Sequence, residues 1–303
     1  MMSDTLSEKI KNIKEEKNAV ILCHIYQNPE IQDIADYVGD SLGLSRQAAD
    51  ASNDIIVFCG VRFMAETAAV LNPEKKVLMP APDAGCPMAD MITPDQLGKL
   101  KTEYPDAPVV CYVNSTAEIK AMSDVCVTSA NAVSIVSRMQ ESRVIFVPDR
   151  YLGIHVRKNT DKEIILWDGH CPAHIRIQPS SVEQVKKEYP GATVMVHPEC
   201  LPEVQDIADH ILSTGQMCAK AEELDNREFI IGTETGIIYT LQKQNPEKTF
   251  LPVSRDIICP DMKETTLENL FSCLQKESGR ITVPDDVSER ALKAITRMLE
   301  MSG

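Results

Sequence analysis

The sequence predicts an α/β protein made of three homologous three-layer α-β-α units, each with a small parallel sheet. Three observations indicate this fold. Short apolar runs typical of buried parallel strands alternate with helical patterns along the 303 residues. The same landmarks return three times, 85 or 88 positions apart, and each copy ends in a Cys-Pro pair. Units of this size are small for independent domains, so we expect them to pack about a pseudo-threefold axis around a central cavity.

The first predicted strand of each unit ends in a polar residue. These strands cover residues 19–24, 108–112 and 192–197, and they end at His24, Tyr112 and His197. Hydroxyl and carboxylate side chains favour helix starts, so helices are expected to begin at Asp40-Ser41, Thr128-Ser129 and Ser213-Thr214. A second strand follows at 55–58, 144–147 and 229–231. Each unit should therefore alternate strands with helices.

A third strand in each unit leads to Cys86-Pro87, Cys171-Pro172 and Cys259-Pro260. We place the units at 1–88, 89–173 and 174–275, followed by a C-terminal segment, 276–303, that packs on the units. The helical pattern of this segment runs from Ser288 to Met301, and we expect it to dock on the first or third unit. At the other end, Leu6, Ile10 and Ile13 predict a short amphipathic helix within residues 1–17.

The composition excludes several classes of partner. A net charge of −14, from 31 basic and 45 acidic residues, argues against nucleic acid or an anionic membrane, because both bind basic patches. No apolar run approaches the ~18 residues that cross a bilayer. The polar segment 1–17 resembles neither a signal peptide nor a transit sequence. We expect a cytoplasmic protein whose ten cysteines are reduced or metal-bound.

Cys86, Cys171 and Cys259 are the candidate metal ligands, because only these cysteines recur at one register in all three units. Three thiolates about a threefold axis suit one face of a [4Fe-4S] cluster, and ferredoxin-type motifs also end in Cys-Pro. The fourth iron would lack a protein ligand and could act as a Lewis acid. Zinc on three cysteines and a water is the competing metal. The remaining cysteines are expected to be core or incidental residues: Cys23, Cys59, Cys111, Cys126, Cys200, Cys218 and Cys273.

Ser41, Ser129 and Thr214 are candidate anion ligands. Each one alone would be interpreted as a plain helix cap. In parallel sheets, however, ligands bind beyond the carboxyl ends of the strands, where these residues recur. Three helix N-termini facing one cavity would present free N–H groups and partial positive charge. The pattern therefore predicts a site for a ligand with several anionic groups, and the residues could still cap their helices.

The residues at the ends of the first strands are candidate acid–base groups. These triplets are His24-Ile25-Tyr26, Tyr112-Val113-Asn114 and His197-Pro198-Glu199. They supply two imidazoles, two phenols, one carboxylate and one amide, all costly to bury unless they are paired. His174, three residues after Cys171, could support that ligand. We interpret Glu66, Asp149 and Glu234 as structural residues outside the repeated register.

Several fragments of the sequence resemble the quinolinate synthase family, and the resemblance covers nearly the whole chain. The fragments are Cys23-His24-Ile25-Tyr26, Gly39-Asp40-Ser41, 63–67, 83–89, Tyr112-Val113-Asn114, 169–172, 196–200 and 233–236. The resemblance implies condensation of iminoaspartate with dihydroxyacetone phosphate to give quinolinate, phosphate and water in NAD biosynthesis. It also implies a [4Fe-4S] cluster on Cys86, Cys171 and Cys259, and transient contact with the aspartate oxidase or dehydrogenase that supplies the imine.

The resemblance further implies roles for single residues. The carboxylates of iminoaspartate would be held by Ser129, Thr214, His197 and Tyr112-Val113-Asn114. Ser41 and His24 would lie beside the triose or its phosphate. Our hypothesis is that the open iron binds a substrate hydroxyl or carboxylate, while Glu199 and Tyr26 handle protons.

Three rival functions remain open. Diphthamide-synthesis enzymes also bring three cysteines from three repeats to one cluster, which they use to cleave S-adenosylmethionine. The triplets Tyr112-Val113-Asn114 and His197-Pro198-Glu199 suit a small polyanion better than that substrate pair. A sensor of oxygen or iron would need an effector segment that the sequence does not offer. Electron transfer normally uses a fully ligated cluster.

Overall fold

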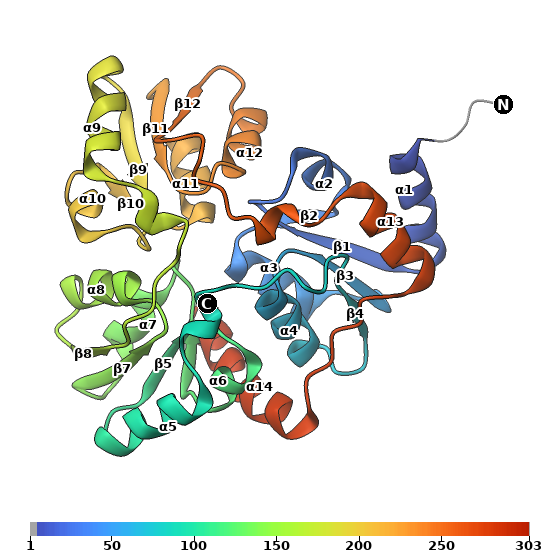
Figure 1. Cartoon of the computed structure of the whole chain (residues 1–303), viewed down its shortest axis with the longest axis horizontal. Helices are drawn as coiled ribbons and strands as arrows, with labels where there is room; N and C mark the ends of the chain where they lie inside the picture. Colours follow the sequence, from blue (N-terminus) through green and yellow to red (C-terminus); the bar gives the residue numbers. More distant parts are fainter. Residues whose placement is uncertain (1–4, 303) are drawn as a thin grey trace.

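The computed structural model describes residues 5–302, and three lobes make up the chain (Figure 1). Each lobe holds one four-stranded sheet whose neighbouring strands are all parallel. The strand orders are β2-β1-β3-β4, β6-β5-β7-β8 and β10-β9-β11-β12, which is one topology written three times. The predicted fold of three α/β units is therefore confirmed. The boundaries between the units stay a prediction.

The first sheet is buried on both faces. Its strands are β1 (Ala19–His24), β2 (Tyr37–Gly39), β3 (Ile55–Cys59) and β4 (Lys76–Leu78). Its helices are α1 (Leu6–Glu16), α2 (Pro29–Ile34), α3 (Ser41–Asp50) and α4 (Arg62–Leu71). In β1, Ile21 and Cys23 pack toward α1 and α2, whereas Val20 and Leu22 pack toward α3 and α4. Burial on both faces explains why the strand is a continuous apolar run.

The second and third lobes repeat this arrangement. The second contains α5 (Pro94–Glu103), β5 (Val109–Tyr112), α6 (Ala117–Ala121), β6 (Val125–Val127), α7 (Ala132–Arg138), β7 (Arg143–Val147), α8 (Arg150–Lys158) and β8 (Glu163–Leu166). The third contains α9 (Pro179–Glu188), β9 (Thr193–Val196), α10 (Pro202–Asp206), β10 (His210–Ile211), α11 (Thr214–Glu223), β11 (Glu228–Gly232), α12 (Ile237–Gln244) and β12 (Thr249–Pro252). Short 3-10 helices follow the Cys-Pro pairs: η1 (Ala89–Met91), η2 (His174–Arg176) and η3 (Asp261–Lys263).

The sequence pattern missed one strand in every lobe. These strands, β2, β6 and β10, are only two or three residues long, too short to give a periodic signal. Each follows an aspartate whose carboxylate accepts the N–H of an early residue of the central strand. The contacts are Asp36 with Ile21, Asp124 with Val109 and Asp209 with Val194, at 2.7–2.8 Å. The repeat therefore includes a carboxylate that fixes the register of the edge strand.

The two ends of the chain pack on different lobes. Ile10 of α1 is fully buried with Leu6 and Ile13 packed beside it, as the amphipathic pattern predicts. Residues 1–4 of that segment lie outside the described residues. After η3 the chain returns to the first lobe, where α13 (Leu267–Lys276) packs against α1 (Figure 1). Leu270 and Leu274 of α13 share the same buried cluster.

The last helix, α14, docks differently from the prediction. It spans Asp285–Met301, begins three residues before the predicted Ser288, and packs chiefly against α6 and β6 of the second lobe. The first lobe contributes a smaller contact through α4, so docking on the first or third unit was mostly wrong. The buried face is formed by Ala291, Ala294, Ile295 and Met298. Periodicity revealed this apolar face but could not name the surface that covers it.

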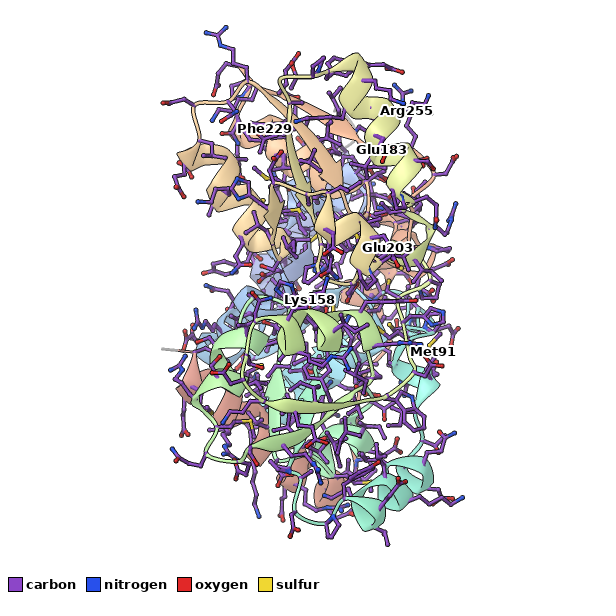
Figure 2. The ribbon with its side chains drawn as sticks, turned by 90° about the vertical axis from the view of Figure 1, so that its left-hand side faces the viewer. Met91, Lys158, Glu183, Glu203, Phe229 and Arg255 are labelled. Atoms are coloured by element: carbon purple, nitrogen blue, oxygen red, sulfur yellow. The ribbon has the colours of Figure 1, made fainter. Side chains whose placement is uncertain are left out.

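Polar contacts also join the lobes. Figure 2 shows Lys158 of α8 at the junction of the second and third lobes, where its ammonium lies 2.7 Å from the carboxylate of Asp206 in α10. The pair is exposed, so it contributes little to stability. Within residues 5–302, the structure contains no helix with the length and apolarity needed to cross a membrane.

Candidate active site

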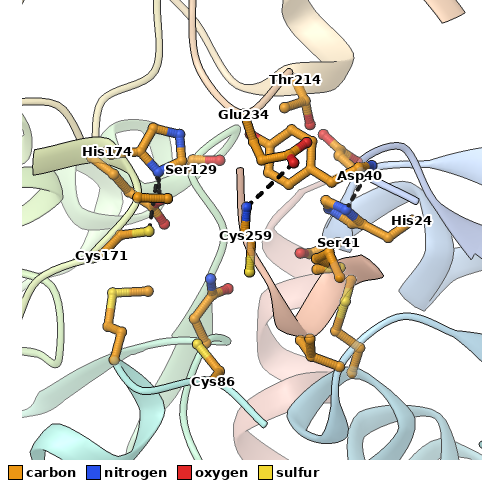
Figure 3. Close-up of a pocket in the computed structure, with 18 of the residues that line it drawn as sticks. His24, Asp40, Ser41, Cys86, Ser129, Cys171, His174, Thr214, Glu234 and Cys259 are labelled. Atoms are coloured by element: carbon orange, nitrogen blue, oxygen red, sulfur yellow. Dashed lines mark hydrogen bonds and ion pairs between the residues drawn. The ribbon is translucent and has the colours of Figure 1, made fainter. Parts of the chain in front are cut away.

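One cavity lies where the three lobes meet, and the empty space in and at the mouth of it, open solvent included, is about 690 Å³. Figure 3 shows the sulfur atoms of Cys86, Cys171 and Cys259 pointing into it from the first, second and third lobes. None of the other seven cysteines lines the cavity. Six of those seven are buried in the packed core, as expected, whereas Cys218 is partly exposed. The structure thus brings together the three cysteines that share a register.

The spacing of these thiols is wider than a single tetrahedral zinc would hold. Three thiolates around one tetrahedral zinc would place their sulfurs ~3.8 Å apart. Among the described residues, Cys86, Cys171 and Cys259 do not form a ligand group within 4.8 Å. Burial raises the pKa of Cys86 to about 12 and that of Cys259 to about 11. These thiols therefore need a bound cation to lose their protons at neutral pH.

Two helix N-termini face the cavity, where three were predicted. Ser41 and Thr214 line it as the first residues of α3 and α11. The caps are the preceding residues, Asp40 and Ser213, so capping by Ser41 and Thr214 was wrong. Ser129 also lines the cavity, but it lies in a turn three residues before α7. There the backbone carbonyl of Thr128 accepts the N–H groups of Asn131 and Ala132 in a single turn, and the side chains of Thr128 and Asn131 also accept backbone N–H groups, before the regular helix begins.

His24 and His197 present the same ring nitrogen to the cavity. In both rings Nδ1 accepts a backbone N–H from two residues further on, donated by Tyr26 at 3.2 Å and by Glu199 at 3.3 Å. A neutral ring with this contact carries its proton on Nε2. Burial lowers the pKa of both histidines to about 3, so both are neutral at pH 7. Nε2 of His197 lies 3.1 Å from the hydroxyl of Ser129.

A buried chain of hydrogen bonds joins two tyrosines across all three lobes. The hydroxyl of Tyr26 lies 2.5 Å from that of Thr233, which lies 2.7 Å from Nε2 of His174. Nδ1 of His174 lies 2.7 Å from one carboxylate oxygen of Glu199. The other oxygen of Glu199 accepts the hydroxyl proton of Tyr112 at 2.6 Å. The path runs from the first lobe through the third to the second.

The charges along this chain are set by burial and by each other. Burial alone would raise the pKa of Glu199, but His174 and His197 bring it down to about 2. Burial raises the pKa of Tyr26 and Tyr112, which therefore stay protonated. A carboxylate that is hydrogen-bonded to a protonated phenol and lies beside an imidazole is placed to relay protons.

His174 lies within the site, in contact with both Cys171 and Glu199. Its Nδ1 lies 3.2 Å from the sulfur of Cys171, and its side chain is fully buried. Together Cys171, His174 and Glu199 place three potential metal ligands within 4.8 Å of one another. We therefore assign His174 to the site, where it supports both a cysteine and the carboxylate.

Of the three remaining predicted residues, one lines the cavity and two do not. Asn114 lines the cavity, whereas Val113 lines a smaller neighbouring space behind Ser41. Pro198 is not among the lining residues; its carbonyl accepts the side-chain amide of Gln205. No lysine or arginine lines the cavity among the described residues. Anions would therefore be held by neutral donors and helix ends.

Sequence reasoning missed several residues of this site. Asp40 and Glu234 line the cavity, and Thr233 completes the hydrogen-bond chain. Glu234 and Asp149 are 85 positions apart, so placing them outside the repeated register was wrong. That spacing was the signal that could have identified them. An apolar wall completes the lining: Val61, Phe63, Met64, Met88 and Met262.

The fold and cavity define a class: a three-repeat α/β enzyme in which each lobe delivers one cysteine to a shared pocket for a small molecule. A family model described as "Quinolinate synthetase A protein" matches residues 8–300. The chain therefore belongs to the quinolinate synthase family, as the sequence fragments predicted.

Curated relatives agree along the full chain. A quinolinate synthase of Dehalococcoides mccartyi strain CBDB1 is 53% identical over 301 residues, covering 99% of this chain and 100% of its own. That of Methanoregula boonei is 51% identical over 302 residues, covering 99% and 100%. Quinolinate synthase 2 of Methanosarcina acetivorans is 49% identical over 304 residues, covering 100% and 98%. The match therefore extends over all three lobes.

Proposed function

We propose that this chain is a quinolinate synthase that condenses iminoaspartate with dihydroxyacetone phosphate to give quinolinate, phosphate and water. The observation that carries the proposal is the convergence of Cys86, Cys171 and Cys259 beside the carboxylate of Glu199 in one cavity. Family membership supports the overall reaction.

The residues of the cavity suit two small anions. Ser129 and His197 lie together on one side and would receive a carboxylate of iminoaspartate, with Thr214 at the start of α11 for the other. Ser41 at the start of α3, with His24, would receive the triose phosphate. Neutral donors suit this task because they bind the anions without adding a fixed charge that would retain the product.

The three cysteines fit a [4Fe-4S] cluster, because they line one cavity and no other cysteine does so. Cys86, Cys171 and Cys259 would hold it. When bound, a cluster with one iron free of protein ligands supplies Lewis acidity toward a substrate oxygen. The carboxylate of Glu199, 2.7 Å from His174, lies on the same side of the cavity as Cys171.

The hydrogen-bond chain suggests how protons move during condensation and loss of water. Tyr26 and Tyr112 face the cavity at the two ends of this hydrogen-bond chain, and Glu199 and His174 lie between them. Glu199 would accept a proton released at one end, and His174 would pass it through Thr233 toward Tyr26. Such positioned groups contribute roughly 10²–10⁴-fold to rate.

Replacing Cys171 with serine tests the proposal. The variant should lose bound iron and quinolinate formation when prepared and assayed without oxygen, because a hydroxyl is a poor ligand for iron in a cluster. Cys218→Ser is the matched control, since Cys218 is also partly exposed but lies outside the cavity. Full activity of the Cys171 variant without iron would contradict the proposal.

The comparisons give no support to the diphthamide-type, sensor or electron-transfer functions. The relatives match over nearly their whole length, and they are named quinolinate synthases. A cytoplasmic location and transient contact with an imine-supplying oxidase or dehydrogenase stay predictions.

A further inference from the structure

Glu234 is a fully buried carboxylate that the proposed chemistry leaves without a role. It follows β11 and lines the cavity beside Cys259. One oxygen, Oε2, accepts the backbone N–H of Gly236 at 2.6 Å. The other, Oε1, accepts the backbone N–H of Cys259 at 3.3 Å (Figure 3, dashed line). A cluster-ligand candidate is therefore bound through its own amide to a buried charge.

The same oxygen also pairs with a lysine at the far end of the cysteine turn. Oε1 of Glu234 lies 2.9 Å from the ammonium of Lys263. Lys263 ends η3, four residues after Cys259, so Glu234 ties the two ends of this turn together. Lys263 also donates to the backbone carbonyl of Tyr26 in the first lobe. The pair therefore joins the cysteine turn to the segment that carries a candidate acid–base group.

The equivalent residue of the second lobe shows what is particular about Glu234. Asp149 lies 85 positions earlier and is equally buried. Its shorter side chain caps α8 by accepting the N–H of Leu152 at 2.7 Å. Burial raises the pKa of this carboxyl group well above its usual value, and the backbone N–H of Cys171 acts in the opposite direction, but among the described residues no lysine or arginine pairs with Asp149. Only the third lobe combines a carboxylate, a cysteine amide and a lysine in this way among the described residues.

We infer that Glu234 and Lys263 are positioning residues that form a charge pair at the Cys259 turn, and that this pair sets the reduction potential of the group held by the three cysteines. The inference rests on the proposed [4Fe-4S] cluster. Reduction adds negative charge, so a nearby carboxylate disfavours it and a nearby ammonium favours it. The two members of the pair therefore act in opposite directions, which a purely structural role would not produce.

Three variants test this pair by redox titration of the anaerobically purified protein, followed by spectroscopy of the reduced cluster. Glu234→Gln keeps the size of the side chain and leaves Lys263 unpaired, so the potential should shift to a more positive value. Lys263→Met leaves the carboxylate unpaired, so the potential should shift to a more negative value. The double variant should return close to wild type, because the two changes compensate.

Glu66→Gln is the matched control. Glu66 also accepts a backbone N–H, from Ala117 at 3.1 Å, and pairs with a cation, Arg62, at 3.1 Å, but it lies outside the cavity. The reduction potential of the cluster in the Glu66→Gln variant should equal that in the wild-type protein. If Glu234→Gln does not retain the cluster, Lys263→Met carries the test, since Lys263 is partly exposed and tolerates replacement better.

The possible failures are distinct. Wild-type protein without iron and sulfide would refute the proposed cluster, and the inference would fall with it. A wild-type cluster together with equal potentials in all variants, or shifts of the same sign in both single variants, would overturn the inference alone.

Discussion

At the scale of single residues, the site relies on neutral donors. His24 and His197 each use Nδ1 to accept a backbone N–H, which leaves Nε2–H for the cavity. This local loop is set by the sequence, because in both triplets the histidine stands two residues before the donating amide. Binding of anions therefore depends on geometry more than on net charge. The protein can carry a net charge of −14 and still hold anionic substrates.

Thr233→Val should break the proton path without changing the lining of the cavity. In the wild-type protein the hydroxyl of Thr233 bridges Tyr26 and His174. Valine has the shape of threonine but has no hydroxyl to form this bridge. We expect kcat for quinolinate formation to fall by about 10- to 100-fold with little change in KM. Thr265→Val is the control, because Thr265 is equally buried but its hydroxyl has no partner. Equal kcat values in the two variants would show that the path is not used.

Site residues that recur at the same position of all three units could be predicted from the sequence. Site residues that occur in only one unit could not. Cys86, Cys171 and Cys259 were found because proline marks each of them in the sequence. Thr233 was missed, since its partners are 207 and 59 positions away and only tertiary packing brings them together. The equivalence of Asp149 and Glu234 is present in the sequence as the same 85-residue spacing that relates Tyr112 to His197.

At the scale of elements, the buried face of α14 packs against β6 and covers this edge strand of the second sheet. Its small residues Ala291 and Ala294 let the helix approach β6 and α6 closely, and Ile295 is fully buried between them. The edge strands β2 and β10 of the other two lobes have no such cover from α14. The helix therefore makes one of three similar lobes different from the others.

Ile295→Ala should lower the free energy of unfolding by about 2–5 kcal/mol, because it removes buried methyl and methylene groups and leaves a cavity. Denaturant unfolding followed by circular dichroism measures the change. Leu292→Ala in the same helix is the control and should cost less than about 1 kcal/mol, since Leu292 is 36% exposed. Equal losses in both variants would contradict the docking of α14 on the second lobe.

The central strands of the three lobes were predictable from the sequence, and the edge strands of two or three residues, β2, β6 and β10, were not. The central strands β1, β5 and β9 agree with their apolar runs. The start of α7 was misplaced: a backbone turn begins at Thr128, whose carbonyl accepts the N–H groups of Asn131 and Ala132, but the regular helix starts only at Ala132. A single turn ahead of a helix leaves no periodic trace in the sequence.

At the scale of the whole molecule, the lobes meet through close backbone approaches. A methyl group added at Gly236 would lie 2.6 Å from the carbonyl oxygen of Tyr26, so the third lobe can approach the first only through a glycine. A methyl group at Gly215 would lie 2.7 Å from a carboxylate oxygen of Asp40, again between these lobes. The cavity therefore depends on contacts between lobes that are distant in sequence, which no single repeat could predict.

Acid should destabilise the folded molecule as a whole. The pKa values of His24 and His197 fall from about 6.5 in the unfolded chain to about 3 in the fold, mainly through burial. Between these values the unfolded chain binds more protons, so stability is full above pH 6.5 and declines as the pH falls toward 3. Glu199 acts in the same direction below about pH 4.5. Denaturant unfolding of metal-free protein should therefore show lower stability at pH 5 than at pH 7.

Single replacement of His24 or His197 by glutamine should flatten this pH dependence. His210→Gln, on the partly exposed strand β10, is the control and should leave the slope between pH 5 and pH 7 close to that of wild type. Wild-type stability that does not change across this range would contradict the assigned burial of the two neutral rings.

The distribution of the three cysteines over three successive lobes has a consequence for biosynthesis. On a ribosome, Cys86 emerges 85 residues before Cys171 and 173 residues before Cys259. A complete ligand set exists only once the third lobe has folded against the first two. Maturation of the proposed cluster must therefore wait until the third lobe has been synthesised and folded. A nascent chain that has not yet reached the third lobe would hold only two of the three cysteines.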